Sequence, residues 1–236
     1  MKFCVIIPCH NHSEALFKVL KKIRKGISVI VVDDGSLPPL DIGGTEAVLL
    51  RNPQNMGKAS ALKSGFKYAV EHGFTHAVTM DADGQHPPEF ADDFMRAACK
   101  NENSIILGVR DFKNSGAPWG RVFLNKFSNF CMWAETGVRV GDTQCGYRCY
   151  PLKEIAQLNV PQSGFVFEVE LLVKAAWANV GFSEIKIPAI YDAGTLASSH
   201  YRPFADTVKF TIMNIKLFFT RLLTTSKTRE RIALKK

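Results

Sequence analysis

Short apolar runs rich in β-branched residues alternate along the first half of the chain with segments whose apolar residues recur every three or four positions. The runs predict strands at residues 3–8, 28–36, 46–52, 76–83 and 104–110. The first two are continuously apolar, which is typical of strands buried on both faces. The segments between the runs predict helices with one apolar side. Strands and helices in regular alternation predict an α/β fold with a mostly parallel, doubly wound sheet.

The first predicted helix carries start and stop signals. Its apolar stripe comprises Leu16, Val19, Leu20 and Ile23. Asn11, with Glu14 three positions later, predicts a capping box at the start, and Gly26 predicts the end. Two further helices are expected, over 56–73 and, opened by prolines, over 87–101.

After residue 110 the pattern is less regular. The expected elements are an aromatic-rich helix after a polar loop within 111–137, a turn and strand at 141–151, a helix at 165–177, a last strand at 185–192 and a long helix from 204. The chain contains no repeat, low-complexity tract or linker. We therefore expect one domain at 1–200, followed by a tail at 201–236.

Composition favours a soluble globular protein. Of the 236 residues, 46% are hydrophobic and 22% are charged. No run reaches about 18 apolar residues, so no transmembrane helix is expected. The apolar run that begins at Phe3 is interpreted as the first strand and not as a secretory signal. Six scattered cysteines without Cys-x-x-Cys spacing indicate free thiols in a reducing cytoplasm.

The net charge of +8 is concentrated in the tail, where residues 201–236 hold nine Lys or Arg and two acidic residues. The tail helix also has an apolar stripe, formed by Val208, Ile212, Ile215, Phe219, Leu222 and Leu223. Basic amphipathic helices are typical of proteins that lie on an anionic membrane surface. Packing of this helix on the body is the alternative. No DNA- or RNA-reading motif accompanies the charge, so nucleic acid is not an expected partner.

A short acidic motif places Asp81, Asp83 and Gln85 at the end of a predicted strand. Alternate side chains of an extended segment point the same way, so the three would offer oxygen ligands on one side. Mg²⁺ and Mn²⁺ prefer such ligands. A plain surface turn is the alternative. Asp33 and Asp34 also follow a strand, and we expect both acidic pairs to share the crevice beyond the carboxyl ends of the strands.

Five motifs in order along the chain together resemble the family 2 inverting glycosyltransferases. They are VIIPCHN (5–11), VVDDGS (31–36), NxGKAxALxxG (55–65), MDADGQHPPE (80–89) and DTQCGYRCYP (142–151). The branch containing dolichyl- and polyprenyl-phosphate sugar synthases is the most similar. The resemblance implies a GT-A fold, a nucleotide-sugar donor and a divalent cation. It covers the C-terminal third of the chain more loosely.

The resemblance also implies three groups of residues around the donor. The group that would hold the nucleoside is Pro8, Asp33 and Asp34. The group that would line the nucleotide pocket is Asn55, Gly57 and Lys58. The group that would hold Mg²⁺ or Mn²⁺ on the diphosphate is Asp81, Asp83 and Gln85, with Asp83 also assigned to the catalytic residues. Such a metal and a nearby lysine would neutralise the charge that develops on the departing nucleotide.

The first motif departs from the family pattern, because His12 stands where a carboxylate commonly touches the nucleoside. The base preference, uridine or guanosine, is therefore left open. For His10 and His12, a packing or capping role is favoured over a catalytic one.

The acceptor side departs as well, because no adjacent acidic pair lies between residues 135 and 170 to deprotonate a sugar hydroxyl. A phosphate acceptor is already anionic and needs positioning rather than a strong base. Asp142 is the candidate for a base or an orienting carboxylate. The candidate phosphate ligands are Arg121, Arg148 and Arg202. For Glu168 and Glu170, a functional and a structural role are both kept.

The segment 198–210 lies where the relatives carry a flap over the donor. The resemblance therefore implies that Ser199, His200 and Arg202 touch the diphosphate. An ordinary helix entry at Pro203 is the alternative.

Together these features predict a metal-dependent inverting glycosyltransferase that moves a sugar from a UDP- or GDP-sugar to a polyprenyl phosphate or another envelope lipid. It is expected to act as a peripheral protein on the cytoplasmic face of the cell membrane. The alternatives are transfer to a saccharide or glycolipid hydroxyl, and binding of a nucleotide sugar without turnover.

Overall fold

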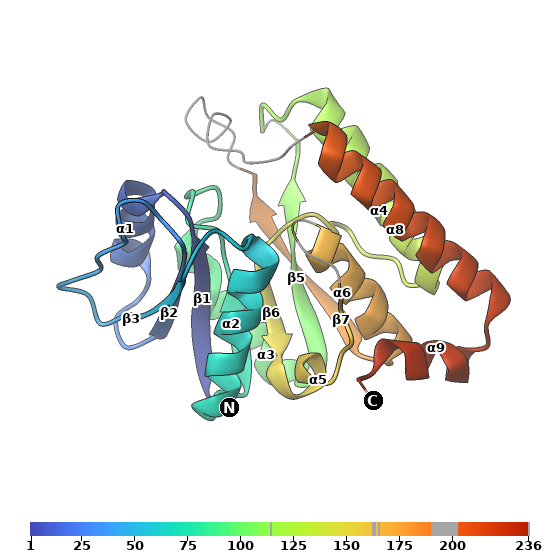
Figure 1. Ribbon diagram of the computed structural model, residues 1–236, viewed down its shortest axis with the longest axis horizontal. Helices are drawn as coiled ribbons and strands as arrows, with labels where there is room; N and C mark the ends of the chain where they lie inside the picture. Colours follow the sequence, from blue (N-terminus) through green and yellow to red (C-terminus); the bar gives the residue numbers. More distant parts are fainter. Residues whose placement is uncertain (114, 162–163, 165, 190–202, 236) are drawn as a thin grey trace.

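A seven-stranded sheet with helices on both faces forms the described part of the chain (Figure 1). The computed structural model describes residues 1–113, 115–161, 164, 166–189 and 203–235, with side chains from 207 onward in the last range. The strands are β1 (Phe3–Cys9), β2 (Ser28–Asp34), β3 (Val48–Asn52), β4 (His76–Thr79), β5 (Ser104–Asp111), β6 (Arg148–Pro151) and β7 (Gly181–Pro188). Their order is β3-β2-β1-β4-β6-β5-β7. Only β6 runs antiparallel to its neighbours, so the predicted mostly parallel α/β fold is confirmed.

The helices pack in two layers that bury opposite faces of the strands. They are α1 (Ser13–Lys22), α2 (Lys58–Glu71), the 3₁₀ turn η1 (Pro88–Phe90), α3 (Ala91–Lys100), α4 (Trp119–Thr136), α5 (Leu152–Ala156), α6 (Val166–Trp177), α8 (Pro203–Leu223) and α9 (Ser226–Ala233). In β1, Cys4 and Ile6 join the core beside α2 and α6, whereas Val5 and Ile7 join the core beside α1 and α3. This alternation confirms that the first strand is buried on both faces.

The predicted capping box at the start of α1 is wrong. His12 is the N-cap residue, and its side chain makes no capping hydrogen bond. Asn11 has a positive φ of 57°, and its Oδ1 accepts a hydrogen bond from the Leu37 amide at 2.9 Å. The Asn11 side chain therefore connects the turn before α1 to the turn that follows β2. His10 and His12 lie in this connection between β1 and α1.

Two strand boundaries also differ from the prediction. β4 ends at Thr79, and Ala82 and Asp83 lie in a turn before Gly84, whose φ is +77°. The predicted alignment of Asp81 and Asp83 on one side of an extended segment is therefore wrong, because the segment turns. The last strand, β7, covers Gly181–Pro188 and so begins four residues before the predicted start at 185, since its pairing with β5 begins at Ser104. Of the predicted end, residues 190–192 lie outside the described residues.

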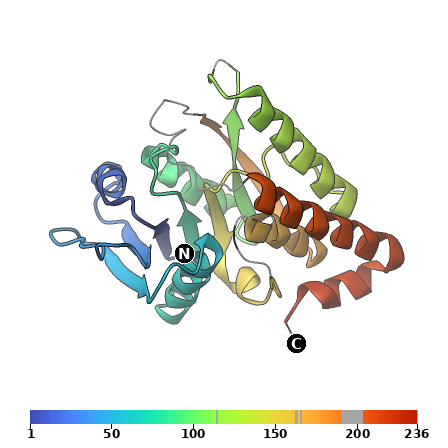
Figure 2. The ribbon, with the colours of Figure 1, turned by 45° about the horizontal axis from the view of Figure 1, so that its top comes forward.

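The C-terminal helices pack against the body, yet they do not bury the predicted apolar stripe. α8 contacts α4 and α6, and α9 contacts α6 (Figures 1 and 2). Met213, Leu217 and Ala233 join the core that covers α6. The stripe residues of α8 are all exposed. Within the described residues, no helix combines the length and apolar character needed to span a membrane.

Candidate functional site

Three charged side chains from distant segments meet beyond the carboxyl end of β4. The Lys58 Nζ lies 2.6 Å from Asp81 Oδ1 and 2.9 Å from Glu168 Oε2. Lys58 begins α2, Asp81 follows β4, and Glu168 lies in the first turn of α6. We call these residues the Lys58 cluster. Its position is where ligands of doubly wound sheets bind, and both Lys58 and Asp81 remain partly exposed to solvent.

The cluster is compact because Gly146 lies against it without a side chain. A Cβ at that position would lie 2.8 Å from the Lys58 Nζ, 3.1 Å from Asp81 Oδ2 and 3.3 Å from Glu168 Oε1. The Thr79 hydroxyl donates to the Gly146 carbonyl at 2.8 Å, which fixes this backbone to the end of β4. A larger residue at 146 would displace the charged groups.

The charges of the cluster reinforce one another. Burial by itself would raise the pKa of Asp81, but the ammonium of Lys58, together with His86, holds it well below its usual range. Burial would lower the pKa of Lys58, but Asp81 and Glu168 raise it instead. Lys58 is therefore a permanent cation and Asp81 a permanent anion at neutral pH.

The pKa of Asp83 is shifted in the opposite direction from that of Asp81. Burial and the neighbouring charge of Asp81 raise its pKa. Its Oδ1 accepts the Gln85 amide at 2.9 Å within the turn. Two carboxylates that repel each other favour a cation between them, because a divalent ion offsets both charges.

Two buried polar atoms without a described hydrogen-bond partner belong to residues that lie next to Asp81. Among the described residues, His86 Nδ1 and Glu168 Oε1 are buried without a hydrogen-bond partner. The described side chains include no ready-made metal site of three or more His, Cys, Asp or Glu residues. Mg²⁺ and Mn²⁺ commonly take one or two carboxylates and complete their shell with water and substrate phosphates. Asp81 and Asp83 therefore fit such an ion.

Asp34 shapes the loop that leads into the cluster. Its Oδ1 accepts from Asn52 Nδ2 at 2.7 Å and from the Met56 amide at 3.1 Å, and its Oδ2 accepts from the Gly57 amide at 2.7 Å. Gly57 has a φ of +88°, a conformation suited to glycine, and it directly precedes Lys58. Asp34 thus positions Lys58 through the backbone.

Asp33 is fully buried and serves the neighbouring turn. Its carboxylate accepts from the Ser36 amide at 2.9 Å and the Leu40 amide at 3.2 Å, and it pairs with Arg51 at 3.0 Å. Arg51 was missed by the sequence argument, because nothing in the motif marks its partner. The assignment of Asp33 and Asp34 to the nucleoside stays a prediction, since their described oxygens all bond within the protein.

Asp142 is fully buried, and its described hydrogen bonds and ion pair go to residues outside the Lys58 cluster. It forms an ion pair with Arg110 at 2.7 Å and accepts from the Gln144 and Cys145 amides at 3.0 Å each and from the Asn125 side chain. This saturation favours the orienting role of Asp142 over the base role. The carboxylate fixes the loop that ends at Gly146.

Arg148 is similarly enclosed. Its guanidinium donates to the carbonyls of Thr143 and Cys145 at 2.7 Å each, to the Glu168 carbonyl at 2.9 Å and to the Tyr150 hydroxyl at 3.1 Å. Only 1% of the residue is exposed, so it braces the base of the site. A direct contact with phosphate stays a prediction that this geometry does not favour.

The other predicted site residues are spread around the opening. Pro8 lies in β1 beside Val32, and Asn55 is exposed in the loop before Gly57. Arg121 lies in the first turn of α4. The predicted flap residues Ser199, His200 and Arg202 lie outside the described residues.

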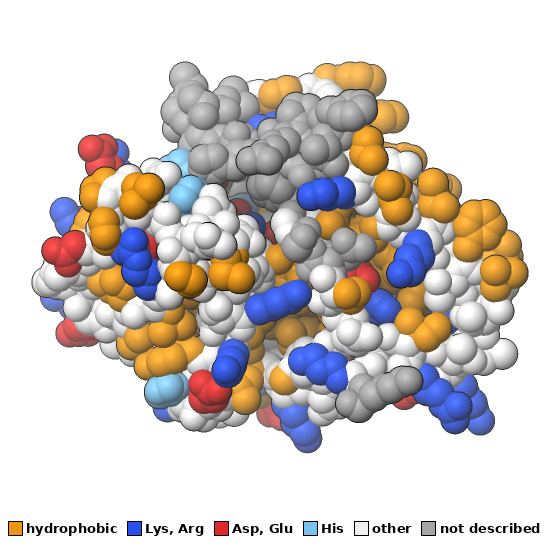
Figure 3. Space-filling model, in the orientation of Figure 1, with side chains coloured by type: hydrophobic (Ala, Val, Ile, Leu, Met, Phe, Trp, Pro, Cys, Tyr) orange, Lys and Arg blue, Asp and Glu red, His pale blue; other side chains and the backbone are white. Residues whose placement is uncertain are grey.

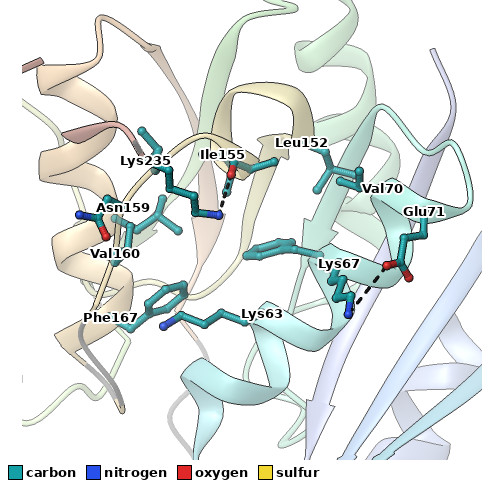
Figure 4. Close-up of a pocket in the computed structure, with 14 residues that line it drawn as sticks. Lys63, Lys67, Val70, Glu71, Leu152, Ile155, Asn159, Val160, Phe167 and Lys235 are labelled. Carbon is teal, nitrogen blue, oxygen red and sulfur yellow. Dashed lines mark hydrogen bonds and ion pairs between the residues drawn. The ribbon is translucent and has the colours of Figure 1, made fainter. Parts of the chain in front are cut away.

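A separate groove of about 440 Å³ lies along α2, α5 and α6 (Figure 4). Its walls are mostly apolar and include Phe66, Leu152 and Phe167, with Lys63, Lys67 and Lys235 beside them. The groove contains none of the predicted site residues, so the chemistry is assigned to the Lys58 cluster.

A family model described as Glycosyl transferase family 2 matches residues 4–155, more than half of the chain. The chain belongs to this family. The match spans β1 through β6, and it therefore includes Lys58, Asp81 and Asp83. Membership in the family makes this chain a glycosyltransferase, in place of the alternative of a binding protein without turnover.

Relatives of this glycosyltransferase include two enzymes named for lipid acceptors. A polyprenol monophosphomannose synthase from Mycolicibacterium smegmatis is 28% identical over 83% of this chain and 79% of its own length. An undecaprenyl-phosphate mannosyltransferase from Micrococcus luteus is 25% identical over 84% of this chain and 87% of its own length.

Solved structures share the fold of this glycosyltransferase. Glucosyl-3-phosphoglycerate synthase from Mycobacterium tuberculosis, in complex with Mn²⁺, UDP and phosphoglyceric acid, matches with a TM-score of 0.60 and 16% identity over 93% of this chain and 78% of that chain. Mannosyl-3-phosphoglycerate synthase from Rubrobacter xylanophilus matches with a TM-score of 0.64 and 12% identity over 94% and 74%. The GT-A fold is therefore confirmed.

Proposed function

We propose that this glycosyltransferase moves a sugar from a UDP- or GDP-sugar to a polyprenyl phosphate, with inversion and with the help of Mg²⁺ or Mn²⁺. The observation that carries the proposal is the Lys58 cluster beside Asp83. The site has a fixed cation and two nearby carboxylates beyond the carboxyl end of β4, and this combination suits a diphosphate bound with a divalent ion.

Each residue of the site has a task in this proposal. Asp81 and Asp83 hold the cation, which when bound stabilises negative charge on the leaving diphosphate. The Lys58 ammonium, fixed by two carboxylates, adds positive charge at the same edge without moving. Asp34 keeps the loop before Lys58 in place, and Asp142 does the same for the loop before Gly146.

The acceptor is proposed from chemistry and from the relatives. Both relatives described above carry a polyprenyl carrier in their names. A phosphate oxygen is a competent nucleophile at neutral pH, so the site needs no free general base for this acceptor. In agreement, Asp142 is occupied by Arg110 and backbone amides.

One observation favours a second acceptor class. Glu168 holds a buried carboxylate oxygen, Oε1, that has no partner among the described residues. This oxygen lies within the Lys58 cluster, where it would accept a proton from an acceptor hydroxyl that displaces the groups covering it. A saccharide or glycolipid acceptor is therefore the alternative.

The proposed acceptor also sets the location. A polyprenyl phosphate is held in a bilayer, so the enzyme would work as a peripheral protein on the cytoplasmic face of the cell membrane. The basic tail supports this proposal, because anionic headgroups attract such segments.

The proposal is tested in two steps. UDP- and GDP-sugars are screened with Mn²⁺ for thermal stabilisation, since a ligand that binds only the native state raises its stability. The best donor, radiolabelled in the sugar, is then incubated with extracted polyprenyl phosphate or with saccharides. Label in the lipid phase supports the proposal, and label only in saccharide establishes the alternative. Full transfer activity of Asp83→Ala with Mn²⁺ would refute the metal site.

A further inference from the structure

Helix α4 presents a row of large apolar side chains to solvent. The row consists of Trp119, Phe123, Phe127, Phe130 and Trp133, at spacings that place them on one side of the helix, with Leu124 beside them. Trp119 is 79% exposed and Phe130 is 56% exposed. The other side of α4 carries the buried Asn125, Ser128, Met132 and Glu135. The helix therefore has an inverted pattern, because three of the four buried side chains on its inner side are polar while its aromatic groups lie outside.

Helix α8, which packs against α4, also exposes apolar side chains. Its exposed apolar residues are Val208, Ile212, Ile215, Phe218, Phe219, Leu222 and Leu223. The two helices lie side by side and converge at their C-terminal ends (Figures 1 and 2). There the Arg221 guanidinium donates to the carbonyls of Trp133 and Ala134 at 2.8 and 2.7 Å. We call the exposed apolar residues of α4 and α8 the α4–α8 face.

Cations lie on or beside the same two helices. Lys126, Arg139, Lys209 and Lys216 are exposed on or beside the two helices, and Figure 3 shows basic side chains among the hydrophobic ones at this end of the molecule. Among the described side chains of α4 and α8, the only acidic one is Glu135, which is buried. Apolar patches of this extent mark an interaction site. A second copy would oppose like charges, whereas an anionic lipid surface complements both the aromatic groups and the cations.

We infer that the α4–α8 face docks on an anionic lipid bilayer, with the aromatic row of α4 entering the interfacial layer. The inference rests on the proposed transfer to a lipid acceptor and adds the surface that faces the lipid. Tryptophan and phenylalanine suit this layer, because their rings are large and apolar. Helix α8 of the tail thus forms one part of the proposed bilayer contact, and α4, from the middle of the chain, forms the other part.

The inner side of α4 connects this face to the site. The Ser128 hydroxyl accepts from Thr143 Oγ1 at 2.7 Å, and Asn129 Nδ2 donates to the Gly141 carbonyl at 2.7 Å. These contacts hold the loop that continues to Gly146, against the Lys58 cluster. One helix, about 10 Å across, therefore separates the proposed bilayer surface from the loop that borders the site. Docking by α4 would hold the site at a fixed distance from the headgroups.

The first test removes the aromatic row without touching the site. The triple variant Phe123→Asn, Phe127→Asn, Phe130→Asn alters only exposed positions. The double variant Leu37→Asn, Val70→Asn is the matched control, because both residues are exposed and lie outside α4 and α8. Both are sedimented with vesicles of phosphatidylglycerol and phosphatidylcholine, and with phosphatidylcholine alone. The triple variant should bind the anionic vesicles at least about tenfold more weakly than the control and the wild type.

The second test reads the depth of α4 directly in the wild-type protein. Lipids brominated along the acyl chain should quench the emission of the exposed Trp119 and Trp133, and the quenching should be lost in the double variant Trp119→Phe, Trp133→Phe, which keeps only the buried Trp177. Vesicle binding by the triple variant equal to that of the wild type, or emission of Trp119 and Trp133 that brominated lipid leaves unquenched in vesicle-bound protein, would overturn the inference. A dimer in sedimentation velocity that the triple variant dissociates, with vesicle binding unchanged, would assign the face to self-association.

The proposed function and the proposed docking face can be refuted independently of each other. Transfer to a short-chain, water-soluble prenyl phosphate without vesicles should be the same for the triple variant and the wild type. Absence of that transfer in both proteins would refute the proposed function, while a difference in vesicle binding would still establish the docking face.

Discussion

The Lys58 ammonium lies 2.6 Å from Asp81 Oδ1, with Lys58 at the start of α2 and Asp81 just beyond β4. The contact places a cation at the edge where the diphosphate of a donor is proposed to bind. It also keeps Asp81 ionised despite its burial, which is the state that a divalent cation requires.

Lys58→Met is expected to damage both stability and turnover. The substitution leaves Asp81 and Glu168 next to each other without their cation, and unpairing a buried charge costs about 3 kcal/mol, less where water reaches the site. We expect the free energy of unfolding in urea to fall by about 2 kcal/mol and sugar transfer to fall at least about 100-fold. Lys67→Met, an exposed position on the same helix, is the control and should change neither.

Asp83→Asn is expected to separate stability from function. Burial and the charge of Asp81 raise the pKa of Asp83, so removing its charge relieves repulsion in the empty site. We expect the free energy of unfolding without metal to stay the same or rise by about 1 kcal/mol. The extra thermal stabilisation that Mn²⁺ gives with the donor should disappear. Glu46→Gln, at an exposed position, should retain it, and its retention in Asp83→Asn would contradict the metal assignment.

Glu168→Gln is expected to distinguish the two acceptor classes. If the acceptor is a phosphate, loss of this carboxylate should change transfer by less than about tenfold, because no strong base is needed. If the acceptor is a hydroxyl, transfer should fall by about 100-fold or more, because the group that accepts its proton is lost. The measurement is kcat with each acceptor. Glu102→Gln, exposed and distant in the chain, serves as the control.

Asp142→Asn is expected to behave as a structural change. The variant loses the ion pair with Arg110 inside a fully buried network, so we expect about 3 kcal/mol of lost stability. Activity per folded molecule, measured at low temperature, should stay within about tenfold of the wild type. A loss near 1000-fold in a fully folded variant would instead identify Asp142 as the base.

Glu135→Gln is expected to change the pH dependence of stability. Glu135 is 1% exposed in α4, its oxygens have no partner among the described residues, and burial raises its pKa to about 8 from the usual 4.5. Its stabilising contribution is therefore complete below pH 4.5 and is lost as the pH rises to about 8.

Because glutamine does not ionise, Glu135→Gln should match the wild type near pH 4 and exceed its stability by roughly 1–4 kcal/mol above pH 8. Urea unfolding at a series of pH values measures the difference. A difference that does not vary with pH would show that Glu135 is solvated or paired in solution.

The order of strands and helices was predictable because each element buries a face that leaves a periodic pattern. Continuous apolar runs predicted β1 and β2, and recurring apolar positions predicted α1. The position of Asp81 followed, because β4 ends shortly before it. The details of the turn did not follow, since Gly84 adopts a positive φ that ends the extended segment early.

The candidate site was predictable only in the segments that follow the first strands. Lys58 and Asp81 lie in recognisable motifs, but Glu168 lies in an apolar helix where a structural role was equally reasonable. It joins the cluster because β6 inserts between β4 and β5, and because Gly146 lacks a side chain. The partners of Asp33 and Asp142, Arg51 and Arg110, come from other strands and carry no local signal.

The sequence by itself determined the α/β fold, the family motifs, the basic tail and the existence of an apolar stripe on α8. Periodicity establishes that a helix has an apolar side, but the side that becomes buried depends on which neighbours it meets. Only the tertiary structure decided that Met213 and Leu217 pack inward while Ile212 and Ile215 stay exposed. The same packing turns the aromatic row of α4 outward, because its polar side is needed to hold the loop around Asp142.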